Sequence, residues 1–175
     1  MAGGIDFVPG KSLKINYDFC HQEVMLTELS PGDRLFEIED NGEECWQRMA
    51  KSPVYFDVRV PQYFDKAVLK LKYQNPAGEE FKVGPQTVKD EWLWMLSNIE
   101  QIGTEGKWQV GRAEFDLRRV YQNSPVMRWL ISAPTLEENG EIIKIGEIEI
   151  EFYKGPLSVN NLWGQIKSYL RKIIR

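Results

Sequence analysis

The sequence offers few side chains of the types that catalyse reactions. His21 is the only histidine, so any nucleophile that needs an imidazole base would depend on it. Its neighbour Cys20 would point to the opposite face of a strand. Gly10-Lys11-Ser12 matches the end of a phosphate-binding loop, but Ile5 stands where that motif needs a glycine. G-x-S-x-G and H-E-x-x-H motifs are absent, and we expect that the protein is not an enzyme.

Side chains suited to binding are more numerous. The chain has 6 Trp, 7 Tyr and 8 Phe, and flat rings beside Arg and Asp suit sugars, which present apolar C–H faces and many hydroxyl groups. A tryptophan on a strand can instead pack in the core and take no part in binding. Only one of Arg128 and Trp129 can reach the surface, since neighbours on a strand point to opposite sides. The candidate ligand-binding residues are Tyr55, Asp57, Arg59, Trp92, Trp94 and Arg128.

The cysteines and carboxylates leave several alternatives open. Cys20 and Cys45 could close a disulfide or remain thiols, and with one histidine they cannot form a Cys/His zinc site. The row Glu147, Glu149 and Glu151 is either a solvated face or a charged sheet edge protected against pairing. We expect no cofactor, although carboxylates and turn carbonyls could hold a structural calcium ion.

Alternating apolar and polar residues predict the strands that must position these groups. In 52–61 the valines and Phe56 face one side, while Tyr55, Asp57 and Arg59 face the other. Stacked sheets would place these three beside Lys70 and Lys72 on one outer face. Segment 90–102 is ambiguous, and a strand with Trp92 and Trp94 on one side explains it better than a helix. The other predicted strands are 24–29, 34–39, 67–75, 79–84, 107–117, 126–133 and 142–153.

Turn residues predict how some of these strands connect. Ser-Pro-Gly-Asp at 30–33 predicts a hairpin between 24–29 and 34–39, and 40–44 predicts a second turn. Glu138-Asn139-Gly140-Glu141 predicts a hairpin between the last two strands. Short strands that mostly carry one polar face are typical of an antiparallel sandwich.

The last residues change to a helical period. Ser158 can cap a helix, and the apolar residues that follow recur every 3.6 residues on one face. This amphipathic basic helix either packs on its own sandwich or docks a partner or membrane surface. We therefore expect an N-terminal arm over 1–23, a β-sandwich over 24–156 and a helix over 157–175. The residues of this helix that we expect to contact a partner or membrane are Trp163, Lys167, Arg171 and Lys172.

Three closing segments resemble a known family. Trp108 to Leu117, the aromatic strand 127–134 and the Ile/Glu strand 142–155 resemble the last strands of galactose-binding-like and carbohydrate-binding jelly rolls. The resemblance implies a mainly β, two-sheet antiparallel sandwich that binds ligands without reaction. Gly146-Glu147 stands where such domains often carry an acidic pair, so no calcium or ligand contact is carried over there.

These observations lead to two hypotheses for function. The first is a non-catalytic module that presents an aromatic and polar surface to a glycan or surface polymer. The alternative is a structural or assembly domain of a cell-surface or particle protein, docked through its basic helix to a protein partner or membrane. The net charge of −4 argues against a nucleic-acid partner, and no apolar run is long enough to span a membrane. An extracellular or cell-surface location is favoured for a fragment of a larger protein, and a cytoplasmic one otherwise.

Overall fold

A computed structural model describes residues 12–21, 24–60, 64–76, 78, 80–88, 91–120 and 125–154. The helix expected over 157–175, with Trp163, Lys167, Arg171 and Lys172, lies outside these residues and stays a prediction. Most of the arm expected over 1–23 also lies outside the described residues. Among the described residues no helix is both long and apolar enough to cross a bilayer.

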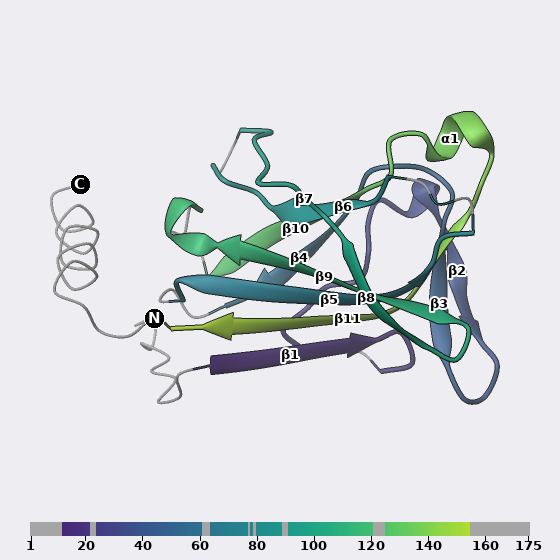
Figure 1. Cartoon of the computed structure of the whole chain (residues 1–175), viewed down its shortest axis with the longest axis horizontal. Helices are drawn as coiled ribbons and strands as arrows, with labels where there is room; N and C mark the ends of the chain where they lie inside the picture. Colours follow the sequence, from purple (N-terminus) through teal and green to yellow (C-terminus); the bar gives the residue numbers. More distant parts are fainter. Residues whose placement is uncertain are drawn as a thin grey trace, which may run out of the picture.

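Two antiparallel sheets pack face to face, which confirms the predicted β-sandwich (Figure 1). The large sheet has the strand order β2-β3-β11-β5-β9-β8, with β1 pairing beside the second half of β11. The small sheet has the order β4-β10-β6-β7. The large-sheet strands are β1 (Ser12–Asp18), β2 (Leu35–Asp40), β3 (Cys45–Met49), β5 (Lys66–Gln74), β8 (Glu100–Glu105), β9 (Trp108–Asp116) and β11 (Ile143–Tyr153); the small-sheet strands are β4 (Val54–Arg59), β6 (Lys82–Pro85), β7 (Ser97–Asn98) and β10 (Val126–Ser132).

The core lies between the sheets and follows the predicted alternation. Trp129 of β10 is fully buried, stacks on Phe56 of β4 with centroids 6.3 Å apart, and meets Phe115 of β9 edge-on at 5.1 Å. In β11 the buried isoleucines change phase at Gly146, where the pairing register with β5 shifts. This bulge adds one residue, so that both halves of the strand face the core.

The hairpin predicted at 138–141 is wrong, although strands 107–117, 126–133 and 142–153 are confirmed as β9, β10 and β11. β10 and β11 belong to different sheets, so the chain must cross the sandwich between them. It does so through helix α1 (Leu136–Asn139), which ends at Gly140 with φ 64°. Asn-Gly fits the left-handed end of a helix as well as it fits a hairpin turn.

The hairpin predicted between 24–29 and 34–39 is also wrong. Segment 24–30 runs beside β4 instead, with isolated bridges from Leu26 to Val58 and from Ser30 to Tyr55. β2 pairs with β3 across the turn at 41–44, where Asn41 Oδ1 accepts hydrogen bonds from the backbone N–H groups of Glu43 and Glu44. The turn predicted at 40–44 therefore joins two paired strands, whereas the Pro-Gly turn at 30–33 does not.

A disulfide joins Cys20 to Cys45, with Cα atoms 5.2 Å apart. It ties the chain after β1 to the first residue of β3. β1 pairs with β11, so residues 12–18 of the expected arm belong to the large sheet. Closing a loop of this separation stabilises a fold by about 3 kcal/mol through the unfolded chain.

Candidate functional site

The candidate residues of the small sheet lie on its outer side, as their alternation predicts. Asp57 of β4 is directly opposite Arg128 of β10, and the two form a bidentate ion pair with Nε–Oδ1 2.8 Å and Nη2–Oδ2 3.0 Å. The hydrogen bonds to Asp57 raise the pKa of the Arg128 guanidinium. Arg59 is exposed on the same face. Because Trp129 is buried in the core, Arg128 is the member of that pair that reaches the surface.

Three aromatic side chains meet on this face and form what we call the aromatic platform, Tyr55, Trp92 and Trp94. Their ring centroids lie 5.6–6.3 Å apart and their planes are tilted by 33–60°. Trp92 is 72% exposed, and the other two rings are half-buried. The structure thus brings together residues that are far apart in the sequence.

Backbone contacts hold the segment that carries the two tryptophans against β6. Met95 N–H donates to the carbonyl of Pro85 at 3.0 Å, and Thr87 N–H donates to that of Leu93 at 2.8 Å. A Cβ atom at Gly84 would lie 1.8 Å from the carbonyl oxygen of Met95. Glycine at 84 is therefore what lets this segment cross β6 closely enough for Trp94 to reach Tyr55.

Lys70 and Lys72 do not share this face, and their predicted place beside Tyr55 is wrong. They lie on β5 of the large sheet, whereas Tyr55 lies on β4 of the small sheet. Consecutive strands of a sandwich often cross between sheets, so similar alternation did not imply a common surface.

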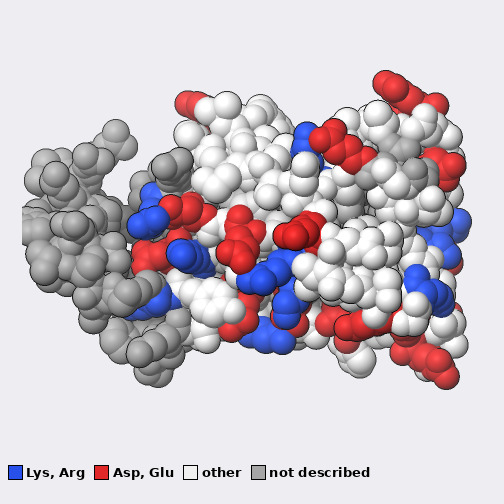
Figure 2. Space-filling view, in the orientation of Figure 1, with Lys and Arg blue, Asp and Glu red and all other residues white. Residues whose placement is uncertain are grey.

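The outer face of the large sheet is covered by ion pairs, and acidic and basic side chains are mixed across it in Figure 2. Glu149 of β11 lies 2.7 Å from the ammonium of Lys14 and 3.0 Å from that of Lys70. Burial raises the pKa of Glu149, but the hydrogen bonds from the two lysines and the charges of these lysines together outweigh burial and lower it. Because β11 is an inner strand, its row of glutamates is not a protected edge, and Glu149 pairs with a lysine on each neighbouring strand.

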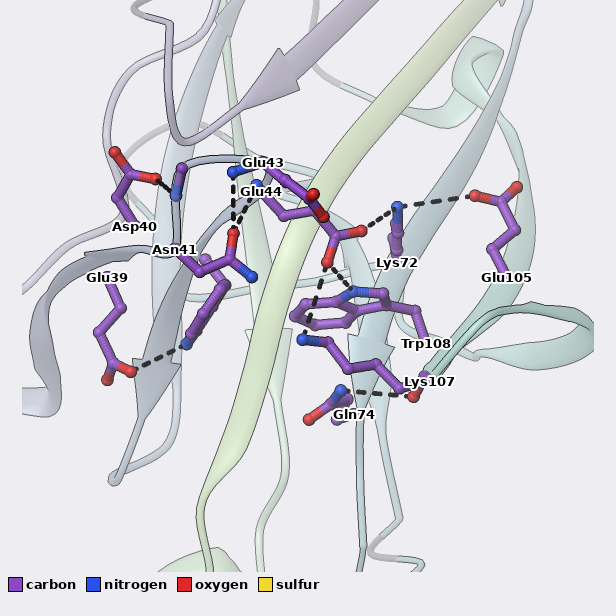
Figure 3. A network of polar contacts seen from close by, with 12 residues as sticks. Glu39, Asp40, Asn41, Glu43, Glu44, Lys72, Gln74, Glu105, Lys107 and Trp108 are labelled. Atoms are coloured by element: carbon purple, nitrogen blue, oxygen red, sulfur yellow. Dashed lines mark hydrogen bonds and ion pairs between the residues drawn. The ribbon is translucent and has the colours of Figure 1, made fainter.

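At one end of this face lies a cluster that the sequence did not single out as a site. We call it the indole network: Glu44, Trp46, Lys72, Lys107 and Trp108 (Figure 3). Trp108 is only 2% exposed although it points away from the main core. Its Nε1–H donates to Glu44 Oε2 at 2.9 Å, and this bond lowers the pKa of Glu44, with the nearby ammonium groups of Lys72 and Lys107 acting in the same direction.

An open cavity of about 550 Å³ adjoins the indole network at the ends of β5, β9 and β11. Amide side chains and two lysines line it together with Pro76 and Ile142, so polar donors and acceptors stand beside a larger apolar surface. The short turn at 106–107 and the start of β11 supply the lysines. The lining residues are Gln74, Asn75, Pro76, Lys107, Gln109, Ile142 and Lys144.

Within the described ranges, Cys20, Asp40 and Cys45 converge as a group of potential metal ligands. The disulfide occupies both sulfur atoms, and calcium prefers oxygen ligands. This group therefore supplies no calcium site, and the structural calcium ion stays a prediction.

No protein-family model matches the chain, and no curated protein matches it. Among solved structures, a CBM35 from Cellvibrio japonicus superimposes with a TM-score of 0.50 at 12% identity, over 82% of this chain and 99% of that one. A CBM6 from Clostridium stercorarium in complex with cellobiose gives 0.46 at 8% identity, covering 81% and 94%. The CBM22-1 xylan-binding domain from Paenibacillus barcinonensis gives 0.46 at 10%, covering 81% and 95%. The first likeness shows the fold alone, the β-sandwich of carbohydrate-binding modules, and confirms the predicted jelly-roll architecture.

Proposed function

We propose that this chain is a non-catalytic carbohydrate-binding module of galactose-binding-like type that holds its glycan on the aromatic platform. The observation that carries the proposal is the convergence of Tyr55, Trp92 and Trp94 with Trp92 72% exposed. Large exposed aromatic surface on a soluble domain marks an interaction site. The fold shared with carbohydrate-binding modules supports the same conclusion.

The platform and the Asp57–Arg128 ion pair contribute different contacts to the glycan. Indole faces pack against the C–H faces of a sugar, while hydroxyl groups need fixed donors and acceptors. The bidentate Asp57–Arg128 pair holds a carboxylate and a guanidinium in one orientation, and Arg59 adds further donors on the same face. Preorganisation of this kind reduces the entropy lost when the ligand binds.

The tilts between the three rings limit the shape of the ligand. Planes inclined by 33–60° form a curved surface and not a flat one. A soluble glycan chain can follow such a surface, whereas a flat crystalline polymer would touch only one ring at a time. The Cys20–Cys45 disulfide supports an extracellular or cell-surface location for this binding, because disulfides persist in oxidising compartments.

A glycan array probed with the full chain tests the proposal. We expect binding to at least one soluble polysaccharide, and a loss of at least tenfold in affinity, about 1.4 kcal/mol, in a Trp92→Ala/Trp94→Ala variant. Tyr153→Ala is the matched control, because it removes an exposed aromatic ring from the other sheet. Wild-type silence across the array would refute the proposal and favour the assembly-domain hypothesis.

A further inference from the structure

The cavity beside the indole network has the features of a second binding site. Its volume of about 550 Å³ lies within the roughly 300–1,000 Å³ of small-molecule sites. It belongs to the large sheet, while the aromatic platform belongs to the small sheet. None of the platform residues lines the cavity, so a ligand held by the lining residues would not depend on the platform.

Two lysines of this lining each place an ammonium group near the same indole ring. Lys107 Nζ lies 5.2 Å and Lys144 Nζ 5.5 Å from the ring centroid of Trp46. Contact with the ring face stabilises each cation but does not neutralise its charge. Trp46 is itself oriented by the hydrogen bond from its Nε1–H to Glu39 Oε2 at 3.1 Å.

The carboxylates nearby do not balance these two lysines. Lys107 has Glu44 at 3.8 Å, and that carboxylate already accepts from Trp108 and Lys72. Within the described part of the chain Lys144 has no carboxylate within ion-pair distance. It also lies directly opposite Arg48 in the β3–β11 pairing, and Arg48 has its own ion-pair partner in Glu39.

The neutral lining is held in place by its own hydrogen bonds. Gln74 Nε2 donates to the carbonyl of Lys107 at 3.3 Å, which fixes the turn that carries this lysine. Gln109 Oε1 accepts from the backbone N–H of Asn75 at 3.0 Å. Pro76 and Ile142 add apolar surface beside these amides. An open cavity with two cations, amides and an apolar wall suits a small, hydroxylated anion.

We infer that this cavity binds the carboxylate of an acidic sugar residue between Lys107 and Lys144. The amides then meet its hydroxyl groups, and Pro76 and Ile142 pack against the ring. The anionic part of this inference rests on the two lysines alone, whereas the sugar part rests on the proposed function. The module would thus bind a glycan chain on the small sheet and an acidic sugar on the large sheet.

Isothermal titration of the full chain with glucuronic acid, glucose and acetate tests this inference. We expect glucuronic acid to bind, glucose and acetate to bind at least tenfold more weakly, and added salt to weaken the binding of glucuronic acid. Lys144→Gln and Lys107→Gln should each reduce affinity at least tenfold. Lys66→Gln is the control, since it removes the same charge from the far end of β5. Thermal melting checks that each variant is folded.

The platform variant separates this inference from the proposed function. Trp92→Ala/Trp94→Ala should keep full affinity for glucuronic acid even while it loses the polysaccharide. Equal affinities for glucose and glucuronic acid, or an unchanged affinity in Lys144→Gln, would overturn the site. Acetate that binds as tightly as glucuronic acid would overturn the assignment to a sugar.

Discussion

The aromatic platform and the indole network place tryptophans on the outer faces of the two sheets with opposite results. Trp92 is 72% exposed, and Trp108 is 2% exposed. Trp108 lies over Gly146, has Trp46 at 6.2 Å and is capped by Glu44 with a lysine on either side. The contrast shows that an outward tryptophan serves binding or stability according to what covers it.

Trp108→Ala should have the largest effect and affect stability. Removing a buried tryptophan typically costs about 3–5 kcal/mol. Chemical denaturation followed by circular dichroism measures the change. A loss below about 1 kcal/mol would mean that the indole network is not a second core.

Glu44→Ala should destabilise the protein by about 1–3 kcal/mol, because the buried indole N–H of Trp108 loses its acceptor. Glu43→Ala is a matched control in the same turn, since its side chain is exposed. Equal losses in the two variants would show that the turn, and not the cap on Trp108, is responsible.

Gly146→Ala should cost about 1 kcal/mol through overpacking. A Cβ atom there would lie 3.1–3.3 Å from three carbons of the Trp108 ring, and the bond to Glu44 prevents that ring from moving freely. In a Trp108→Ala background the same change should be neutral. A full penalty in that background would contradict contact with the ring as its cause.

Acid should weaken the indole network by less than Glu44→Ala does, because a protonated Glu44 can still accept from Trp108. The folded-state pKa of Glu44 lies below its ordinary value of 4.5, so its charge stabilises the fold above pH 4.5 and stops doing so as pH falls through the lowered pKa. The stability advantage of wild type over Glu44→Gln, measured by urea denaturation between pH 7 and pH 3, should shrink over that window. A constant advantage would exclude the carboxylate charge as its source.

Trp92→Ala should have the smallest effect on stability, within about 0.5 kcal/mol, because the ring is mostly exposed. Measured beside Trp108→Ala under the same conditions, it gives the sharpest form of the comparison. A loss similar to that of Trp108→Ala would assign the platform a structural role.

The strand faces could be predicted from the sequence, whereas the assembly of sites could not. Tyr55, Asp57 and Arg59 lie on the outer side of β4 as their alternation predicts, because neighbouring residues of a strand point to opposite sides. Lys144 gave no such signal, since its partners Arg48 and Trp46 come from a strand about a hundred residues earlier. The hairpins predicted at 24–39 and 138–141 were wrong because their turn residues are compatible with more than one local structure.

The sequence by itself determined the mainly β character, the closing strands and the side of strands such as β4 that enters the core, because these depend on neighbours a few residues apart. It did not predict that Trp92 and Trp94 lie before β7, outside any strand. Tertiary structure alone decided which sheet each strand joins and which tryptophan is covered. Glu44 and Trp108 are 64 residues apart in the chain, and only the folded sandwich brings the carboxylate to the indole. Coverage of a side chain is a property of such long-range contacts, so the platform and the indole network became distinguishable only in three dimensions.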